Sequence, residues 1–124
     1  MKILVINPGS TSTKAALFED LKLEAEVKLN HTAEELARFP VIRDQLPMRA
    51  SRVREFLQVS GLGPRDLDVI VARGGLLPPV RHGAYAVTDH LVRTLLDRPA
   101  EEHASNLGAG IARQIGKEDG IPAL

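Results

Sequence analysis

The segment ILVINPGSTSTK, residues 3–14, decides the fold that the sequence predicts. Residues 3–6 are apolar and rich in β-branched side chains, which is typical of a buried strand. Asn7-Pro8-Gly9-Ser10 follows and has the composition of a turn. Because apolar residues return at 15–18, the pattern predicts two strands joined by a polar turn close to the start of the chain.

Further strand signals extend this beginning into a sheet. Glu19-Asp20 supplies a second turn, and residues 21–27 alternate strictly between apolar and polar, which predicts a third strand with one wet face. We expect these three strands to form an antiparallel meander. The remaining strands are expected at residues 67–71, 85–88 and, beginning near Gly120, at the end of the chain.

Helical signals lie between the later strands. The helices are expected near residues 33–40, 48–59, 89–96 and 101–116. Thr32 and Glu35 form a capping-box pattern at the start of the first helix, and Asp89 is the expected cap of the third. The apolar stripe of the second helix leaves Arg49 on the polar side. This mixture of strands and helices predicts an α/β domain.

Composition restricts the class of protein. The 124 residues suit one domain, and 44% apolar with 26% charged residues is usual for a globular chain. Sixteen basic residues balance sixteen acidic ones, so the chain has no net charge with which to hold nucleic acid or an anionic membrane. The absence of cysteine excludes disulfides and thiolate metal sites. Since residues 3–6 are too short for a signal peptide, we expect a cytoplasmic protein.

The polar turn has the residue types of a phosphate-binding loop. Backbone amides can approach an anion closely at glycine, hydroxyls donate hydrogen bonds, and a lysine supplies charge. The candidate phosphate-binding residues are Gly9, Ser10, Thr11, Ser12 and Lys14. A solvated hairpin loop rich in serine and threonine is the alternative interpretation. The Walker spacing is absent and a strand follows the turn, so this is not a P-loop.

Four segments in the same order resemble the butyrate kinases of the acetate kinase family. They are residues 3–14, ARGGLLPPV at 72–80, GAYAV at 83–87 and EHASNLG at 102–108. The arginine-glycine-glycine and histidine-alanine-serine-asparagine stretches favour butyrate kinases over acetate kinases, which carry different residues there. Ala72 departs from the glycine that often precedes the arginine, and the resemblance is weakest from residue 31 to residue 66.

This resemblance implies a ribonuclease-H-like α/β domain of the superfamily that includes the acetate and sugar kinases, heat-shock ATPases and actin. It implies ATP-dependent phosphorylation of butyrate or a similar short-chain carboxylate, with Mg²⁺. Residues 1–124 would be an incomplete N-terminal domain without the C-terminal nucleotide-binding domain. We therefore expect the isolated chain to lack kinase activity and to self-associate through surface that later sequence would cover.

The residues expected to carry catalysis are Asn7, Lys14 and Arg73. By resemblance, Asn7 and Lys14 contact the transferred phosphoryl group or its magnesium shell. Arg73, at the end of a strand, is expected to hold the carboxylate or the transition-state charge through its planar fork. His103 and Asn106 are candidates for a substrate-side role, although a histidine at a helix start more often caps or packs.

Other functions can be weighed against the same residues. Ribonuclease-H-type nucleases, sugar kinases and chaperone-type ATPases usually carry a carboxylate on the first strand, where this chain has the neutral Asn7. A non-catalytic phosphate-binding or assembly module, or a kinase for another short or branched carboxylate, remains an alternative. The remaining histidines, His31, His82 and His90, show no metal-ligand spacing and are expected at the surface, whereas Tyr85 is expected in the core or lining a groove.

Overall fold

A four-stranded mixed sheet forms one layer of the molecule. The computed structural model describes all residues from 1 to 124. The strands are β1 (Lys2–Pro8), β2 (Ser12–Glu19), β3 (Lys22–Asn30) and β4 (Val69–Ala72), in the spatial order β3-β2-β1-β4. β1 pairs antiparallel with β2, and β2 with β3, whereas β4 runs parallel to β1. The predicted α/β class and N-terminal antiparallel meander are therefore confirmed.

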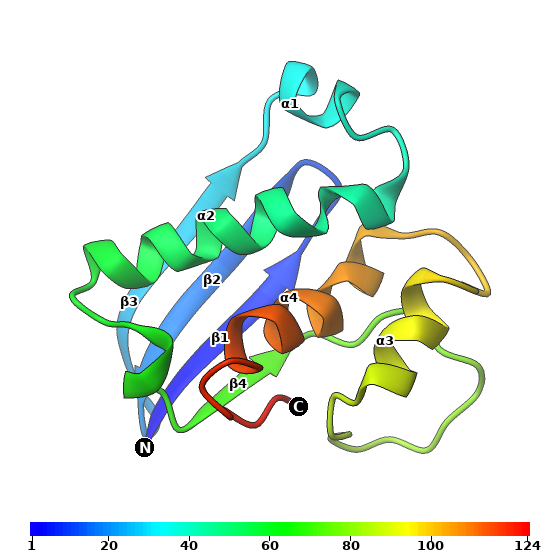
Figure 1. The fold of residues 1–124 in the computed structure, drawn as a ribbon. Helices are drawn as coiled ribbons and strands as arrows, with labels where there is room; N and C mark the ends of the chain where they lie inside the picture. Colours follow the sequence, from blue (N-terminus) through cyan, green and yellow to red (C-terminus); the bar gives the residue numbers. More distant parts are fainter.

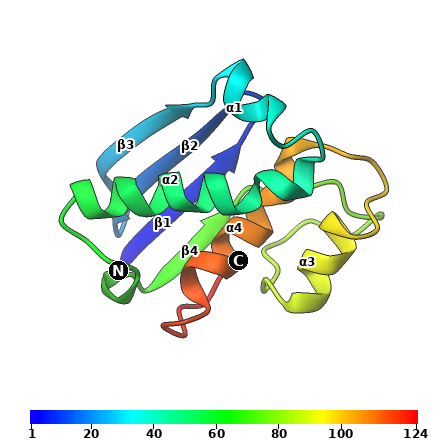
Figure 2. The ribbon, with the colours of Figure 1, turned by 45° about the horizontal axis from the view of Figure 1, so that its top comes forward.

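The helices form a second layer on one face of this sheet. They are α1 (Ala33–Ala37), α2 (Leu46–Val59), α3 (Asp89–Leu96) and α4 (Leu107–Gly116), with short 3-10 turns at 42–45, 64–66 and 104–106. α2 and α4 lie across the same face of the sheet, and α3 packs beside α4 on the side away from β3 (Figures 1 and 2). None of these helices has the length and apolarity that crossing a bilayer requires.

The core lies between the sheet and these helices. Its fully buried members come from every part of the chain and include Leu4, Ile6, Val53, Leu57, Ile70, Leu107 and Ile111. Along β1 the burial alternates, because successive side chains of a strand point to opposite faces. Ile3, Val5 and Asn7, on the face without helices, are only half-buried. The fold is thus a two-layer structure whose second sheet face is open.

Three elements, α1, α2 and β4, lie where local patterns in the sequence predicted them, to within two residues at their starts. α1 begins with the predicted capping box, in which the Glu35 amide donates to Thr32 Oγ1 at 3.1 Å and the Thr32 amide donates to Glu35 Oε2 at 2.9 Å. The helix predicted at 48–59 is α2, which begins two residues earlier at Leu46. The strand predicted at 67–71 is β4, displaced by one or two residues.

Three predicted features differ in detail from the structure. Residues 85–88 form no strand, because their one backbone link to the sheet region is the Val87 amide, which donates to the Ala123 carbonyl at 2.8 Å. Thr88, not Asp89, caps α3, since its hydroxyl accepts from the Leu91 amide at 3.1 Å. The chain end is too short to be a named strand, but it runs parallel to β4: Ile70 and Ala123 form a bridge, and the Ile70 amide donates to the Pro122 carbonyl at 2.9 Å.

The last helix begins later than predicted. Residues 104–106 form a 3-10 turn, and α4 proper starts at Leu107. Asn106 Nδ2 donates to the Glu101 carbonyl at 2.9 Å, which holds the preceding segment outside the helix. A side chain that binds backbone five residues upstream competes with helical hydrogen bonding there.

Burial differs from expectation at three polar or aromatic residues. Arg49, predicted on the polar side of its helix, has an exposed fraction of 0%, and His31, predicted at the surface, has 5%. Tyr85 is 42% exposed, and its hydroxyl donates to the Arg81 carbonyl at 2.7 Å, so it is not a core residue. His82 and His90 are exposed as predicted. Both buried residues, Arg49 and His31, contact the hydroxyl of Thr13 beneath the polar turn.

Candidate active site

A cleft of about 400 Å³ opens between the β1–β2 turn and the loop that follows β4. It is lined by Asn7, Pro8, Gly9, Ser10, Ser12, Lys14, Arg73, Gly74, Leu76, His103 and Ser105. All three residues expected to carry catalysis are in this set, although Arg73 is far from the other two in sequence. Thr11 and Asn106 are the expected site residues that do not line the cleft.

The β1–β2 turn carries free backbone donors at the edge of this cleft, one on Ser10, which lines the cleft, and one on the adjacent Thr11, which does not. Asn7 pairs with Lys14 across the two strands, and the Gly9 amide donates to the Ser12 carbonyl at 2.7 Å, which closes the turn. The amides of Ser10 and Thr11 donate to no other group of the protein. Two unpaired amides at a tight turn are the arrangement that binds anions in phosphate loops.

Arg73 reaches the cleft because β4 runs parallel to β1. The Arg73 amide donates to the Ile6 carbonyl at 2.9 Å, so the pairing of the two strands continues one residue beyond β4. Parallel neighbours end at the same edge of a sheet, which brings Arg73 close to Asn7. The Arg73 side chain is exposed and makes no hydrogen bond or ion pair. Its guanidinium is therefore available to a ligand.

Glycine allows α4 to approach the Arg73 backbone closely. A Cβ at Gly108 would lie 2.8 Å from the Arg73 carbonyl oxygen and 3.3 Å from Ala72 Cβ. Any larger residue at this first turn of α4 would displace the end of β4. The small residue thus fixes where Arg73 leaves the sheet.

His103 and Asn106 have different positions relative to the cleft. His103 is exposed and lines it, while its Nδ1 accepts from the Ser105 amide at 3.1 Å, so the ring also caps the 3-10 turn. With Nδ1 as an acceptor, Nε2 is the ring nitrogen that remains free to donate to a ligand. Asn106 is 2% exposed, and its Oδ1 accepts from the Leu76 amide at 2.8 Å. Its side chain supports the loop after β4 from below.

Lys28, which the sequence did not indicate as a site residue, lies beside Lys14. Lys28 of β3 is directly opposite Lys14 of β2, so both side chains lie on the open sheet face, where they line a neighbouring hollow with Asn7 and Glu26. Neither lysine makes an ion pair. Only the strand register, which the alternating pattern of residues 21–27 does not provide, reveals this juxtaposition.

The residues of the cleft suit an anion. They supply two cationic side chains, an amide and serine hydroxyls, and no carboxylate. The structure also holds no group of three or more His, Asp or Glu side chains arranged around a common point. Because Mg²⁺ is usually held by carboxylates together with substrate phosphates, the cleft residues do not by themselves fit a magnesium site, and Asn7 offers only one neutral oxygen.

Arg49 lies directly beneath the turn. Its guanidinium Nη1 donates to the Gly9 carbonyl at 2.7 Å and to the Ser12 carbonyl at 3.1 Å, and Nη2 donates to the Ser10 carbonyl at 3.1 Å. Gln45 Oε1 accepts from Nε at 3.2 Å and from Nη2 at 2.9 Å. An arginine on a helix gives no sequence signal for such a role, because its partners lie about 40 residues away in the chain.

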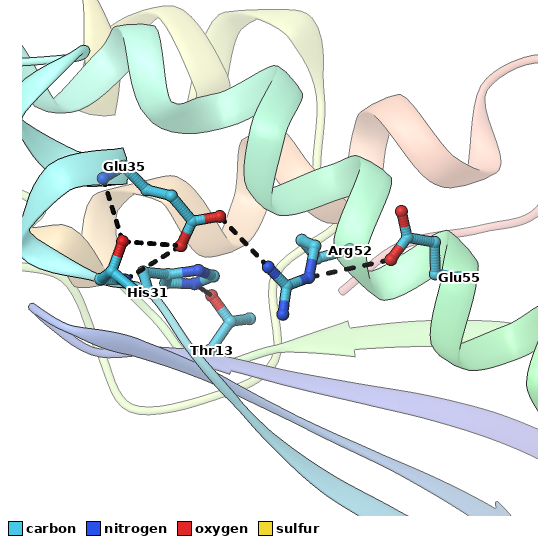
Figure 3. Close-up of polar contacts among 6 residues, drawn as sticks. Thr13, His31, Glu35, Arg52 and Glu55 are labelled. Atoms are coloured by element: carbon cyan, nitrogen blue, oxygen red, sulfur yellow. Dashed lines mark hydrogen bonds and ion pairs between the residues drawn. The ribbon is translucent and has the colours of Figure 1, made fainter.

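His31 and Thr13 complete this buried polar cluster. Thr13 Oγ1 accepts from Arg49 Nη1 at 3.2 Å and lies 2.9 Å from His31 Nε2, whereas His31 Nδ1 is buried without a partner. Figure 3 shows the imidazole between Thr13 and the Glu35–Arg52 ion pair. Burial, and then the charge of Arg49, lower the pKa of His31 below its ordinary value, so the ring is neutral near pH 7.

Comparison with known proteins agrees with the resemblance. No protein-family model matches the chain. A probable butyrate kinase of Thermotoga petrophila is 48% identical over 123 residues, which is 99% of this chain and 34% of the relative. Butyrate kinase 1 of Clostridium acetobutylicum is 40% identical over 122 residues, 98% of this chain and 34% of the relative. Over its whole length, the chain is similar to butyrate kinases.

A probable butyrate kinase 1 of Thermotoga maritima is also similar to the chain, at 46% identity over 123 residues. The resemblance inferred from the four segments is therefore confirmed, and it is consistent with an N-terminal portion of such proteins. The chain spans about a third, 34%, of the length of the curated relatives it matches. Their names describe kinases, and the cleft described above has the cationic character that phosphoryl transfer requires.

Proposed function

We propose that this chain forms the phosphoryl- and carboxylate-binding side of a butyrate kinase-type enzyme. The reaction is the transfer of the γ-phosphoryl group of ATP to butyrate, which gives butyryl phosphate and ADP. The observation that carries the proposal is the meeting of Asn7, Ser10, Ser12 and Lys14 with Arg73 in one cleft that contains no carboxylate. The relatives named butyrate kinase support the choice of acceptor.

This reaction requires no covalent bond between the protein and the phosphoryl group. A carboxylate oxygen attacks the γ-phosphorus while the bond from that phosphorus to the bridging oxygen of ADP breaks, and the acceptor needs no base because it is already ionised. Catalysis then consists of alignment and of neutralising charge spread over the equatorial oxygens. In this scheme Lys14 and the free amides of Ser10 and Thr11 hold the phosphoryl group, and Arg73 holds the carboxylate or the developing charge.

The proposal also covers the domain to which these residues belong, the co-substrate and the metal ion. Residues 1–124 are proposed to be an incomplete N-terminal domain of the ribonuclease-H-like kind, with the nucleotide-binding part in the remaining length of the relatives. ATP is the proposed co-substrate. Mg²⁺ is proposed to accompany its phosphates, with Asn7 touching only the water shell of the ion. The substrate-side role of His103 rests on its position in the cleft lining.

A direct assay tests the function. A complete enzyme that contains this segment should form acyl phosphate from ATP, magnesium and butyrate, whereas the 124-residue chain should form none but should bind inorganic phosphate in a calorimetric titration. Clear turnover by the short chain would contradict the assignment of half a cleft. Phosphate binding by the short chain, with no acyl phosphate from any complete enzyme carrying it, would favour the non-catalytic binding module.

A further inference from the structure

Arg49 is a fully buried cation with no carboxylate partner. It has an exposed fraction of 0% and is bound only by three loop carbonyls, the Thr13 hydroxyl and the amide of Gln45. Glu35 and Glu55, the acids near this part of α2, pair with Arg52 instead. Arginine stays protonated in proteins, so the positive charge beneath the turn remains uncompensated.

The carbonyls that Arg49 binds determine where the opposite amides point. A trans peptide is planar, and its N–H lies opposite its C=O. The carbonyls of Gly9 and Ser10 accept from Arg49, so the amides of Ser10 and Thr11, which share those peptide planes, point away from the guanidinium. These are the two amides of the turn that donate to no protein group.

We propose that Arg49 is the positioning residue of the phosphate loop, fixing from beneath the two peptide planes whose amides bind phosphate and supplying the buried charge that the anion offsets. The inference rests on the proposed phosphate-binding function of the turn. It assigns two separable roles to one side chain. The planar fork orders the loop, and the charge strengthens anion binding through the loop without direct contact.

The variants separate these roles. Arg49→Lys retains the charge, but a single ammonium cannot bridge three carbonyls and Gln45 together. Arg49→Met removes both the charge and the fork while keeping an unbranched stem. Arg54→Met is the matched control, because Arg54 is on the same helix and donates to the Gln114 carbonyl at 2.8 Å, away from the turn.

The first measurement uses the 124-residue chain without ligand. Amide NMR of Arg49→Met and Arg49→Lys should show large shift changes and faster motion at Ser10 and Thr11, while Arg54→Met leaves both amides at their wild-type positions. If the two Arg49 variants keep wild-type loop amides, the proposal is overturned. This result does not depend on phosphate.

The second measurement is a titration with inorganic phosphate. We expect Arg49→Met to raise the phosphate Kd by about tenfold or more, since one unit charge is lost near the site, and Arg49→Lys to recover part of that loss. Arg54→Met should bind like the wild type even if it is less stable. A phosphate Kd unchanged in Arg49→Met would refute the charge role. If the wild type binds no phosphate at all, the proposed function fails, while the ligand-free measurement still decides the positioning role.

A third measurement needs no variant and covers the case in which neither Arg49 variant folds. In the wild type, the Arg49 guanidinium protons should be resolved and slow to exchange with water, because they are buried and bonded. Those of the exposed Arg73 should exchange fast. Equal exchange rates for the two side chains would show that Arg49 does not hold the loop.

Discussion

Two of the segments that line the cleft are held in different ways. The β1–β2 turn is short, joins two paired strands and is bound from beneath by the Arg49 guanidinium. The loop from Arg73 to Thr88 is long and largely exposed, and is fixed mainly at Leu76 by Asn106 and at Val87 by the Ala123 carbonyl. One side of the cleft is therefore a turn bound from beneath by several hydrogen bonds, and the opposite side is a loop anchored at only a few points.

This contrast suggests a division of labour. A loop bound by a buried side chain keeps its donors in place before any ligand arrives, which is what electrostatic preorganisation requires. A loop anchored at a few points can adjust, as closing elements of kinases do.

The largest effect is expected from the two cationic side chains that line the cleft, Lys14 beside the short turn and Arg73 at the start of the long loop. In a complete enzyme containing this segment, Lys14→Ala or Arg73→Ala should lower turnover roughly a hundredfold, since a contact made mainly in the transition state is worth about 3 kcal/mol. Stability should change by about 0.5 kcal/mol or less, because both side chains are exposed. Steady-state kinetics beside thermal denaturation measures both quantities. Arg38→Ala, at another exposed cation, is the control, and near-normal turnover in both variants would refute these roles.

The second effect tests the anchor of the long loop. Asn106→Ala should destabilise the fold by about 1–3 kcal/mol, because the Leu76 amide and the Glu101 carbonyl both lose a partner. Amide hydrogen exchange should rise in residues 74–80 and stay unchanged at Ser10 and Thr11. Faster exchange in both loops would show that they are not independently held.

A smaller effect concerns pH and the short turn. Because the pKa of His31 is lowered in the folded state, the unfolded chain binds a proton more readily, and stability is lost as the pH falls below the ordinary histidine pKa of about 6.5. The groups that face the ring are Arg49 and Arg52, which oppose its charge, and Glu35, which favours it.

Denaturant titrations between about pH 7.5 and about pH 5.5 span the ordinary histidine pKa and measure the loss of folding stability as the pH falls. His31→Gln should flatten the pH dependence, whereas His90→Asn, at an exposed histidine, should preserve it. If the slope of His31→Gln equals that of the wild type, the turn is not supported by a neutral imidazole.

The smallest effect is expected at Lys28, next to the short turn. Lys28→Ala removes a like charge directly opposite Lys14 and should raise stability by less than about 1 kcal/mol. The same change should weaken phosphate binding slightly, because the local positive potential falls. Calorimetry with Lys28→Gln as a second uncharged variant separates the charge effect from the shorter side chain. Lower stability in both variants would contradict the repulsion.

The sequence by itself determined the elements whose patterns involve residues only a few positions apart. Apolar runs on either side of the polar turn fixed β1 and β2, and Thr32 with Glu35 fixed the start of α1, because strand alternation and helix capping involve residues only a few positions apart. The residues expected at the phosphate loop were also read directly from residues 7–14, and their roles stay predictions.

Tertiary structure decided what depends on distant partners. The parallel pairing of β1 with β4 brought Arg73 to the cleft, and the register of β2 with β3 put Lys28 opposite Lys14. The apolar stripe of α2 predicts Arg49 on the polar side of the helix, yet Arg49 is buried, and carbonyls about 40 residues earlier in the chain satisfy its donors. Only folding brings those carbonyls together, so no pattern within α2 could reveal that its arginine supports the loop.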